Sequence, residues 1–150
     1  DVCSSDLGYR KMVIINGHGG NTFKSMIRDL SLDYPDFLIA SSEWFAFVPA
    51  KEYFDEPGDH ADELETSVMM HYHPELVNLD EAGDGNYKKF ASQMLNEKVA
   101  WIPRNWQNVS QDTGIGNPKK ASAGKGKKYA EVVVAKYALL FEELVHKELY

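Results

Sequence analysis

A glycine-rich hexapeptide, Asn16-Gly17-His18-Gly19-Gly20-Asn21, carries a histidine that is well placed to do chemistry. Glycine reaches positive φ without strain and lets a ligand approach the backbone closely, so the imidazole of His18 is held up on a bare loop. A neutral imidazole binds transition metals and also exchanges protons near neutral pH. Two alternatives stay open: His18 donates to a carbonyl in a tight turn, or the loop cradles an anion, although it lacks the P-loop and dinucleotide spacings.

A second group of polar residues contains His60 and Glu65. Asp59 is expected to cap a helix that begins at His60, with Asp62 accepting a hydrogen bond from the amide of the cap. Glu65 then lies about one and a half turns into the helix, and both side chains can lean toward a group beyond its first turn. Apolar neighbours carry Glu65 toward the packed side, where a carboxylate needs a cation or a donor. Asp62 and Glu63 fit an ordinary solvated, acidic helix start.

The elements around His18 predict a parallel α/β arrangement. Lys11–Ile15 is a β-branched run typical of a strand buried on both faces. A helix is expected from Asn21 or Thr22 until Pro35, and the next strand over 37–42. Such a crossover implies parallel strands, whose carboxyl ends form the usual ligand-binding edge. We therefore expect His18 at that edge.

The later part of the chain is less regular. A short helix over Lys88–Leu95 and a strand over Val99–Pro103 are expected, followed by a closing helix whose apolar stripe runs from Tyr129 to Leu144. The lysines between Lys119 and Lys128 are interpreted as a solvated loop and helix start.

Composition bounds the class of protein. The chain has 150 residues, of which 43% are hydrophobic, enough for one domain with a core. A net charge of −7 argues against nucleic acid as a partner. The single cysteine, Cys3, excludes an intramolecular disulfide. No apolar run reaches the roughly 20 residues that span a bilayer, so we expect a soluble, cytoplasmic protein without a membrane partner.

The start of the chain has neither periodicity nor the blocks of a signal peptide. We therefore expect residues 1–7 to be a non-native leader. Residues 8–150 are then expected to be the C-terminal portion of a single, longer domain.

Together, the hexapeptide and His60-Ala61 followed by Glu65-Thr66-Ser67 resemble the creatininase (creatinine amidohydrolase) family. The Tyr72–Val77 continuation, the Gly114–Pro118 turn and the Lys/Gly-containing start of the closing helix are also similar, so the resemblance runs from about Gly8 to the end. It implies a three-layer α/β/α fold with a mostly parallel sheet, here truncated at its N-terminus. It also implies a homo-oligomer, a hexamer in this family, and a metal-dependent amidohydrolase acting on non-peptide C–N bonds or on peptide amides.

Roles follow from the resemblance residue by residue. His18 matches a metal ligand, His60 matches a histidine that transfers a proton, and Glu65 matches an acidic residue at the same edge, expected to serve both catalysis and the metal. Gly19, Gly20 and Asn21 would bind substrate or support the loop. The cofactor implied is Zn, Mn or Fe, with one or two ions in the full-length protein.

Two departures refine the expectation. Creatininases have a tyrosine and a metal-binding glutamate at the positions of Gly19 and Gly20, which argues against creatinine as the substrate and leaves Glu65 as the candidate second-metal ligand. The broader family includes formamide hydrolases and a peptidase that trims a precursor peptide. The family's Glu-x-His segment and a following aspartate belong ahead of the strand at Lys11, so we expect the isolated chain to be inactive. A non-catalytic fragment or an anion-binding α/β module is the alternative.

Overall fold

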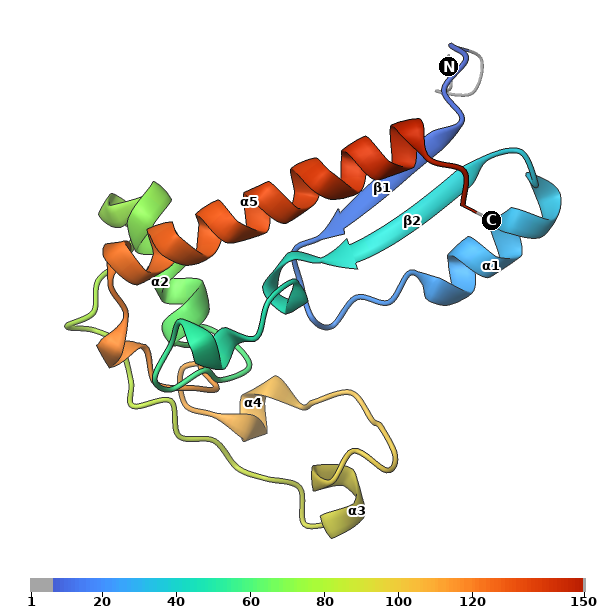
Figure 1. Cartoon of the computed structure of the whole chain (residues 1–150). Coiled ribbons are helices and arrows are strands. Elements are labelled where there is room, and N and C mark those ends of the chain that lie inside the picture. Colours follow the sequence, from blue (N-terminus) through green and yellow to red (C-terminus); the bar gives the residue numbers. More distant parts are fainter. Residues whose placement is uncertain (1–6, 150) are drawn as a thin grey trace. The chain divides into compact units, whose positions relative to one another are not determined.

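The computed structural model describes residues 7–149. Cys3 and the expected leader, apart from Leu7, lie outside the described residues. The described chain falls into two compact units. Unit 1 comprises residues 7–48 and 133–149, and unit 2 comprises Pro49–Val132. The long helix α5, Ala123–His146, begins in unit 2 and continues into unit 1 (Figure 1).

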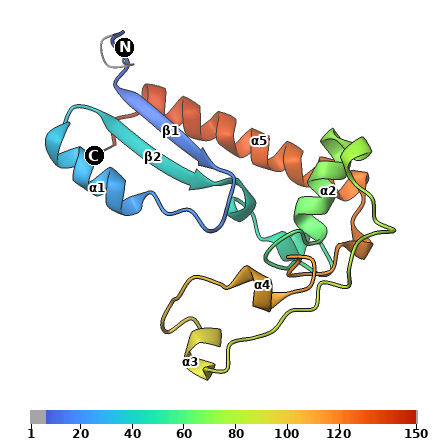
Figure 2. The ribbon, with the colours of Figure 1, turned by 180° about the vertical axis from the view of Figure 1, so that it is seen from behind.

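Unit 1 is built on a parallel pair of strands. Strand β1, Lys11–Asn16, pairs in parallel with β2, Leu38–Glu43, in a register that sets Lys11 opposite Leu38. Helix α1, Lys24–Asp33, connects the two strands, as Figure 2 shows from behind. The predicted strand–helix–strand crossover is therefore confirmed.

The start of α1 differs from the expectation. The helix begins at Lys24 with Phe23 as its N-cap and without a side-chain cap. Asn21 does not cap the helix, because its Nδ2 donates to Asn16 Oδ1 over 3.2 Å within the preceding loop. The expectation that Asn21 or Thr22 caps α1 is therefore wrong.

The β1 strand is less buried than its composition predicts. Met12 is 41% and Ile15 is 53% exposed, because the sheet has two strands in the described part of the chain. The expectation of a strand buried on both faces does not hold for these residues. The fold class is thus a small parallel α/β sheet with helices, and the three-layer α/β/α architecture remains an expectation.

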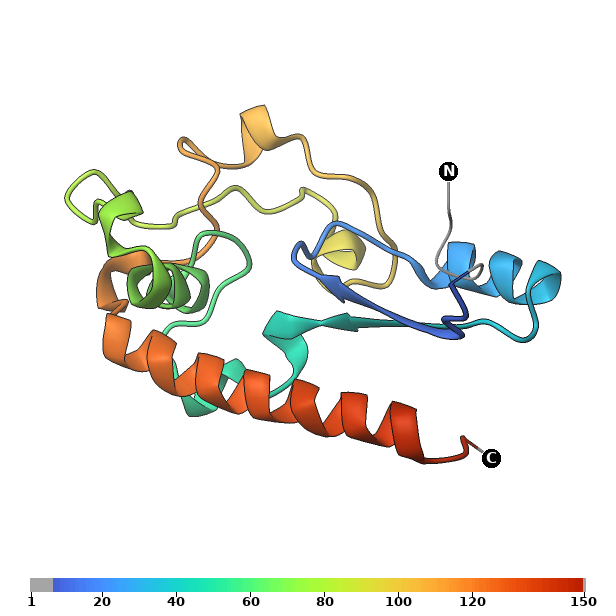
Figure 3. The same cartoon turned by 90° about the horizontal axis from the view of Figure 1, so that it is seen from above.

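The C-terminal part of α5 runs beside the strands of unit 1 (Figure 3). The Tyr137 hydroxyl lies 2.8 Å from the Ser42 hydroxyl of β2. The Tyr137 ring also packs on Phe47, with ring centroids 4.2 Å apart. Tyr137, a member of the apolar stripe predicted for the closing helix, therefore contacts β2 and the segment that follows it, whereas Phe141 of the same stripe is 42% exposed.

Unit 2 consists of short helices joined by loops. Their bounds are η2 Ala50–Glu52, α2 Glu63–Tyr72, η3 Pro74–Leu76, α3 Gln93–Asn96, α4 Trp106–Val109 and η4 Pro118–Lys120. Tyr129, at the start of α5, is fully buried and packs against Phe54, with ring centroids 5.3 Å apart. Leu64 and Ile115 are also buried, so the core of unit 2 lies where α2 and α5 begin.

Two expectations for unit 2 need correction. The strand predicted over Val99–Pro103 is absent, and Trp101 is 80% exposed there because no described segment pairs with it. The helix predicted over Lys88–Leu95 is shorter and shifted, since α3 starts only after Ser92 caps it. In the described chain, none of the helices combines the length and apolar character needed to cross a bilayer.

Candidate functional site

The loop after β1 is held by one buried side chain. Asn16, only 4% exposed, accepts hydrogen bonds at Oδ1 from the His18 amide over 3.1 Å and from Asn21 Nδ2 over 3.2 Å. The Asn21 amide donates to the His18 carbonyl over 3.1 Å and closes the turn. His18 is thereby fixed at the carboxyl end of β1, the edge at which ligands bind in parallel sheets.

The glycines of the loop differ in what surrounds them. A Cβ at Gly20 would lie 2.8 Å from His18 Nε2, closer than side chains pack. A Cβ at Gly19 would make only an ordinary contact, 3.7 Å from the Phe45 ring. Gly20 is thus the position that makes room for the observed imidazole.

The second group of residues lies in unit 2 at the start of α2. Its N-cap is Asp62, which accepts from the Glu65 amide over 2.9 Å and from the Gly58 amide over 2.6 Å. The prediction that Asp59 caps the helix and that His60 is its first residue is therefore wrong. The reason lies in the backbone, because Ala61 adopts φ of +49° and interrupts any helical path from His60.

His60 is placed by pairing with a distant segment. Its amide donates to the Ile115 carbonyl over 3.0 Å, and its carbonyl accepts from the Ile115 amide over 2.8 Å. Ile115 is 3% exposed, so the backbone of His60 is anchored on the core of unit 2. The imidazole itself stays accessible, with 34% of the side chain exposed.

His60 and Glu65 are brought together. Nδ1 of the imidazole lies 3.8 Å from Glu65 Oε2, which makes an ion pair when His60 is protonated. The same Oε2 accepts from the Ala61 amide over 2.6 Å, so Glu65 reaches back as in a capping box. The Glu65 carboxylate and the His60 imidazole therefore lie side by side at the start of α2.

An aromatic side chain next to His60, and a cationic side chain next to that aromatic ring, were not predicted from the sequence. The Trp106 ring packs on the imidazole with centroids 5.1 Å apart, and the Arg104 guanidinium lies 5.5 Å from the Trp106 ring centroid. The sequence offers no signal for this contact, because the two residues are far from His60 along the chain.

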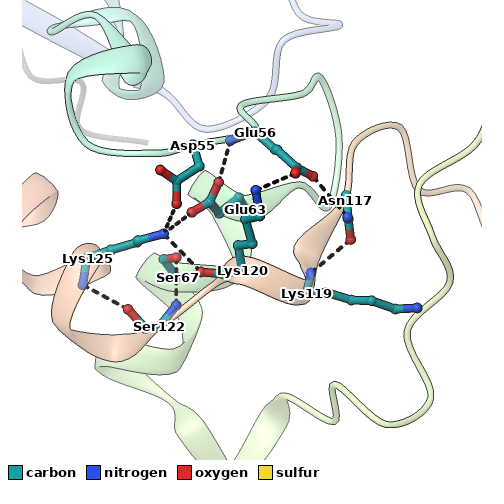
Figure 4. A network of polar contacts seen from close by, with 9 residues as sticks. All are labelled: Asp55, Glu56, Glu63, Ser67, Asn117, Lys119, Lys120, Ser122 and Lys125. Carbon is teal, nitrogen blue, oxygen red and sulfur yellow. Dashed lines mark hydrogen bonds and ion pairs between the residues drawn. The ribbon is translucent and has the colours of Figure 1, made fainter.

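A buried ion pair supports the start of α2 (Figure 4). Glu63 has no exposed side-chain surface, accepts from the Glu56 amide over 2.6 Å and pairs with Lys125 Nζ. Lys125 also binds Asp55 over 2.8 Å. The interpretation of Asp62 and Glu63 as solvated residues is wrong, because both are buried: Asp62 accepts from two backbone amides, and Glu63 has Lys125 as its cation. Lys125 keeps 30% of its side chain exposed but is held by this ion pair.

The same cluster continues along η4. Glu56 binds Lys120 over 2.6 Å and accepts from Asn117 Nδ2 over 2.9 Å. Buried Ser67 of α2 accepts at Oγ from the Ser122 amide over 3.1 Å. These contacts join the loop before α2, the helix itself and the start of α5, so they fix the segment that carries His60 and Glu65.

Charge partners shift the pKa values of this cluster. Hydrogen bonding to Lys125 lowers the pKa of Asp55, and hydrogen bonding to Lys120 lowers that of Glu56. The hydrogen bonds to Asp55 and then Glu63 raise the pKa of Lys125. The ion pairs therefore stay charged across the neutral range.

A pocket of about 360 Å³ opens beside Glu65. Its walls include Met69 of α2, the Val77–Leu79 segment and the Gly114–Gly116 turn. This size falls within the usual range for small-molecule sites, and the walls are mainly apolar with a few polar groups. It is a candidate for the part of the site that holds substrate.

The described residues do not complete a metal site. Among them, no three His, Cys, Asp or Glu side chains gather as a metal ion would require. His18 lies in unit 1, whereas His60 and Glu65 lie in unit 2. Imidazole and carboxylate suit zinc or manganese, yet a catalytic site uses about three protein ligands. The convergence of these residues on one metal therefore remains a prediction.

Comparisons with known proteins match this chain to one family and to relatives of that family. Residues 3–141 match the family model described as Creatininase: Creatinine amidohydrolase. A mycofactocin precursor peptide peptidase of Mycobacterium ulcerans is 31% identical over 82% of this chain and 45% of its own length. Two solved structures are similar as well. A Bacteroides fragilis protein classed with the creatinine amidohydrolases is 60% identical, with a TM-score of 0.91 over 96% of this chain and 57% of that one.

A creatininase structure with manganese is 25% identical, with a TM-score of 0.70 over 93% of this chain and 58% of that one. The chain thus spans about half of the length of the peptidase and somewhat more of the two solved structures.

Proposed function

This chain belongs to the creatininase family, and we propose on that premise that its full-length protein is a metal-dependent amidohydrolase. The bond cleaved is an amide C–N bond of a small molecule or a peptide. The observation that carries the proposal is the His60–Glu65 pair, at 3.8 Å, of which Glu65 lines a pocket of about 360 Å³. That pair supplies a proton carrier and its carboxylate partner, which amide hydrolysis requires at the leaving nitrogen.

His60 is proposed as the proton carrier. The imidazole of His60 gives a proton to the departing amine, and the Glu65 carboxylate lies 3.8 Å from its Nδ1. Because the His60 backbone is fixed on Ile115, the ring is presented to substrate with little freedom of the main chain.

The role proposed for this chain in metal binding is limited to ligands. His18 is one ligand and Glu65 is the candidate for another, with the remaining ligands supplied by parts of the full-length protein outside these residues. Manganese is present in one relative's structure, and the donor types here suit manganese, zinc or iron.

The substrate is proposed to differ from creatinine. By the family resemblance, Gly19 and Gly20 stand at positions that creatininases fill with a tyrosine and a metal-binding glutamate. A Cβ at position 20 would lie 2.8 Å from His18 Nε2, so a larger residue there requires the imidazole to move. The similar peptidase from Mycobacterium ulcerans acts on a precursor peptide, which supports the inclusion of peptide amides among candidate substrates.

The remaining expectations become part of the proposal. The active protein is a cytoplasmic homo-oligomer, a hexamer by family resemblance, and the isolated 150-residue chain is inactive. An anion-binding role has less support, since α1 begins only at Lys24 and not directly after the glycine turn.

The test measures turnover and metal content in the full-length protein. His60→Ala is expected to lower kcat for the best of a panel of formamides, small amides and peptides by about 10²–10⁴ while leaving bound metal unchanged. His73→Ala is the matched control, because His73 is 59% exposed and lies at the other end of α2. Wild-type turnover in His60→Ala, or loss of its metal, would overturn the proposed role.

A further inference from the structure

We propose that Trp106 is a positioning residue for the His60 imidazole. We also propose that the Arg104–Asp59 ion pair holds the Trp106 ring against that imidazole. The effect on catalysis rests on the proposed function, whereas the contact itself can be tested without any substrate.

The contact between the two rings is direct. Their centroids lie 5.1 Å apart with an angle of 57° between the ring planes, which is within the range of attractive aromatic packing. Glu65 Oε2 lies 3.8 Å from Nδ1 of the same imidazole. The His60 imidazole thus lies between the Trp106 indole and the Glu65 carboxylate. These two neighbours restrict rotation about the side-chain bonds of His60.

Trp106 needs a fastening of its own. It begins α4, a helix of four residues, and it follows a segment in which Val99 is 71% and Trp101 is 80% exposed. A segment with so little buried surface is easily displaced. Packing alone therefore does not hold the indole against His60.

Arg104 supplies the fastening. Its Nη1 donates to Asp59 Oδ1 over 3.3 Å, and its Nη2 pairs with Asp59 Oδ2. The guanidinium carbon lies 5.5 Å from the Trp106 ring centroid, so one planar group serves a carboxylate and an aromatic ring together.

The contacts close a ring of interactions around the proton carrier. Asp59 is the neighbour of His60 in the chain, and its amide donates to the Ile115 carbonyl over 2.7 Å. From Asp59 the ring runs through Arg104 and Trp106 back to the imidazole of His60. Every member lies in unit 2, so the arrangement belongs to one compact part of the protein.

Orientation of a catalytic group has a measurable worth. A misplacement of about 1 Å costs up to about 10²-fold in rate, and it affects kcat more than substrate binding. Removing the indole should therefore lower kcat and leave KM nearly unchanged. Phenylalanine retains a ring at this position and should restore most of the activity.

The experiment uses the full-length protein with Trp106→Ala, Trp106→Phe and Arg104→Met. Trp101→Ala is the matched control, since Trp101 is an exposed indole in the same segment. Carbon-13 labelling of histidine gives one ring resonance for each histidine, and His60→Gln identifies that of His60. Circular dichroism shows whether each variant is folded.

The expected result has a spectroscopic and a kinetic part. The His60 ring resonance moves in Trp106→Ala and Arg104→Met, stays close to wild type in Trp106→Phe and is unchanged in Trp101→Ala. For an active amide substrate, kcat falls about 10- to 100-fold in Trp106→Ala. In Trp106→Phe, kcat stays within about threefold of wild type, and KM is nearly constant in both variants.

An unchanged His60 resonance in folded Trp106→Ala would overturn the contact. A moved resonance with wild-type kcat would overturn the positioning role while leaving the proposed function in place. If Trp106→Ala does not fold, Trp106→Phe and Arg104→Met test the proposal in its place. A wild-type His60 resonance and a wild-type kcat in folded Arg104→Met would contradict the proposed role of the Arg104–Asp59 ion pair. Failure of every variant and of wild type to cleave any amide counts against the proposed function alone, because the resonance still reports the contact.

Discussion

At the scale of single residues, the backbone beside His18 and the backbone beside His60 differ in their geometry. Gly20 leaves room beside His18, where a Cβ would lie 2.8 Å from Nε2. Ala61 instead adopts φ of +49°, a conformation that costs an alanine on the order of 1 kcal/mol. The hydrogen bond from its amide to Glu65 Oε2, over 2.6 Å, offsets that cost. Glu65 therefore has two contacts: it accepts a hydrogen bond from the strained Ala61 backbone, and it lies beside the imidazole of His60.

A substitution at Gly20 tests the role of His18. Gly20→Ala should displace the imidazole and weaken metal binding by the full-length protein by about 10-fold or more, because a reoriented ligand binds the metal less tightly. Gly19→Ala is the control, because a Cβ there makes only an ordinary contact of 3.7 Å with Phe45. Competition with a chromophoric chelator measures both affinities. Equal metal affinity in Gly20→Ala and wild type would show that His18 is not a ligand in this conformation.

At the scale of elements, the crossing of α2 and the start of α5 decides how the site is held. A Cβ at Gly126 would overlap the Ser67 carbonyl, so the two helices can approach this closely only with glycine. Ser67 and Ser122 then join the helices by a hydrogen bond of 3.1 Å.

A pair of glycines in α5 makes this testable. Gly126→Ala should destabilise the protein by about 1–3 kcal/mol, because the added methyl group forces the backbones apart. Gly124→Ala should stabilise it by up to about 1 kcal/mol, since its Cβ would meet nothing within 4 Å and alanine favours helix. Urea unfolding of the two variants gives both values. Opposite signs are expected, and a gain in stability for Gly126→Ala would be incompatible with the close crossing.

The ion pairs of Lys125 predict a pH dependence. The pKa of Asp55 lies below its ordinary 3.8, so the stability it contributes is present above that value and is lost as pH falls through the lowered pKa. The pKa of Lys125 lies above its ordinary 10.5, so its contribution is present below 10.5 and is lost as pH rises through the raised pKa. The network is therefore intact between about pH 5 and 10.

Lys125→Met should lower Tm relative to wild type by a nearly constant amount across that window. The difference should shrink at lower pH, where Asp55 becomes protonated, and above pH 10.5, where Lys125 loses its proton. Lys127→Met is the control, since Lys127 is 61% exposed and makes only an i,i+4 pair with Glu131. Differential scanning calorimetry across the pH range measures this. A difference that does not change with pH would exclude the ion pairs as its cause.

The elements also show how far sequence alone can go. The crossover from β1 to β2 was predictable because its signals are local: a β-branched run, a glycine turn and Pro35. The start of α2 could not be predicted in the same way, since Asp59 and Asp62 both suit an N-cap. Which of the two caps the helix depends on the pairing between His60 and Ile115. The burial of Glu63 depends on Lys125, 62 residues away, and no local pattern reports such a partner.

The proximity of two candidate site residues could be predicted from the sequence, whereas their roles stay predictions. His60 and Glu65 were expected to lean toward one group at the start of α2, and the structure places them 3.8 Å apart. Trp106 and Arg104 were missed because their contacts with His60 and Asp59 join segments far apart in the chain. Whether His18 meets the His60–Glu65 pair remains a prediction, as the residues belong to different units.

At the scale of the whole molecule, the chain spans 57% of its Bacteroides fragilis relative. His18 lies in unit 1 and the His60–Glu65 pair in unit 2, and α5 is continuous through both. The proposed enzyme requires ligands beyond those that the described residues bring together. Metal binding is therefore expected to be a property of the full-length protein.

Thermal stability distinguishes a metal site from an anion site. Manganese or zinc at about 100 times Kd should stabilise the chelator-treated, full-length protein by about 2.7 kcal/mol, seen as a rise in Tm. Inorganic phosphate at the same concentration should leave Tm unchanged. A rise with phosphate and none with either metal would favour the anion-binding alternative.

The most direct measurement is an anomalous difference map from crystals of the manganese-loaded, full-length protein. If the proposed function is correct, a manganese peak lies about 2.1 Å from an imidazole nitrogen of His18. Glu65 is then at the same metal centre, and His60 is within reach of the bound water. A peak that His18 does not contact, or a His18 far from both His60 and Glu65, would contradict the proposed function.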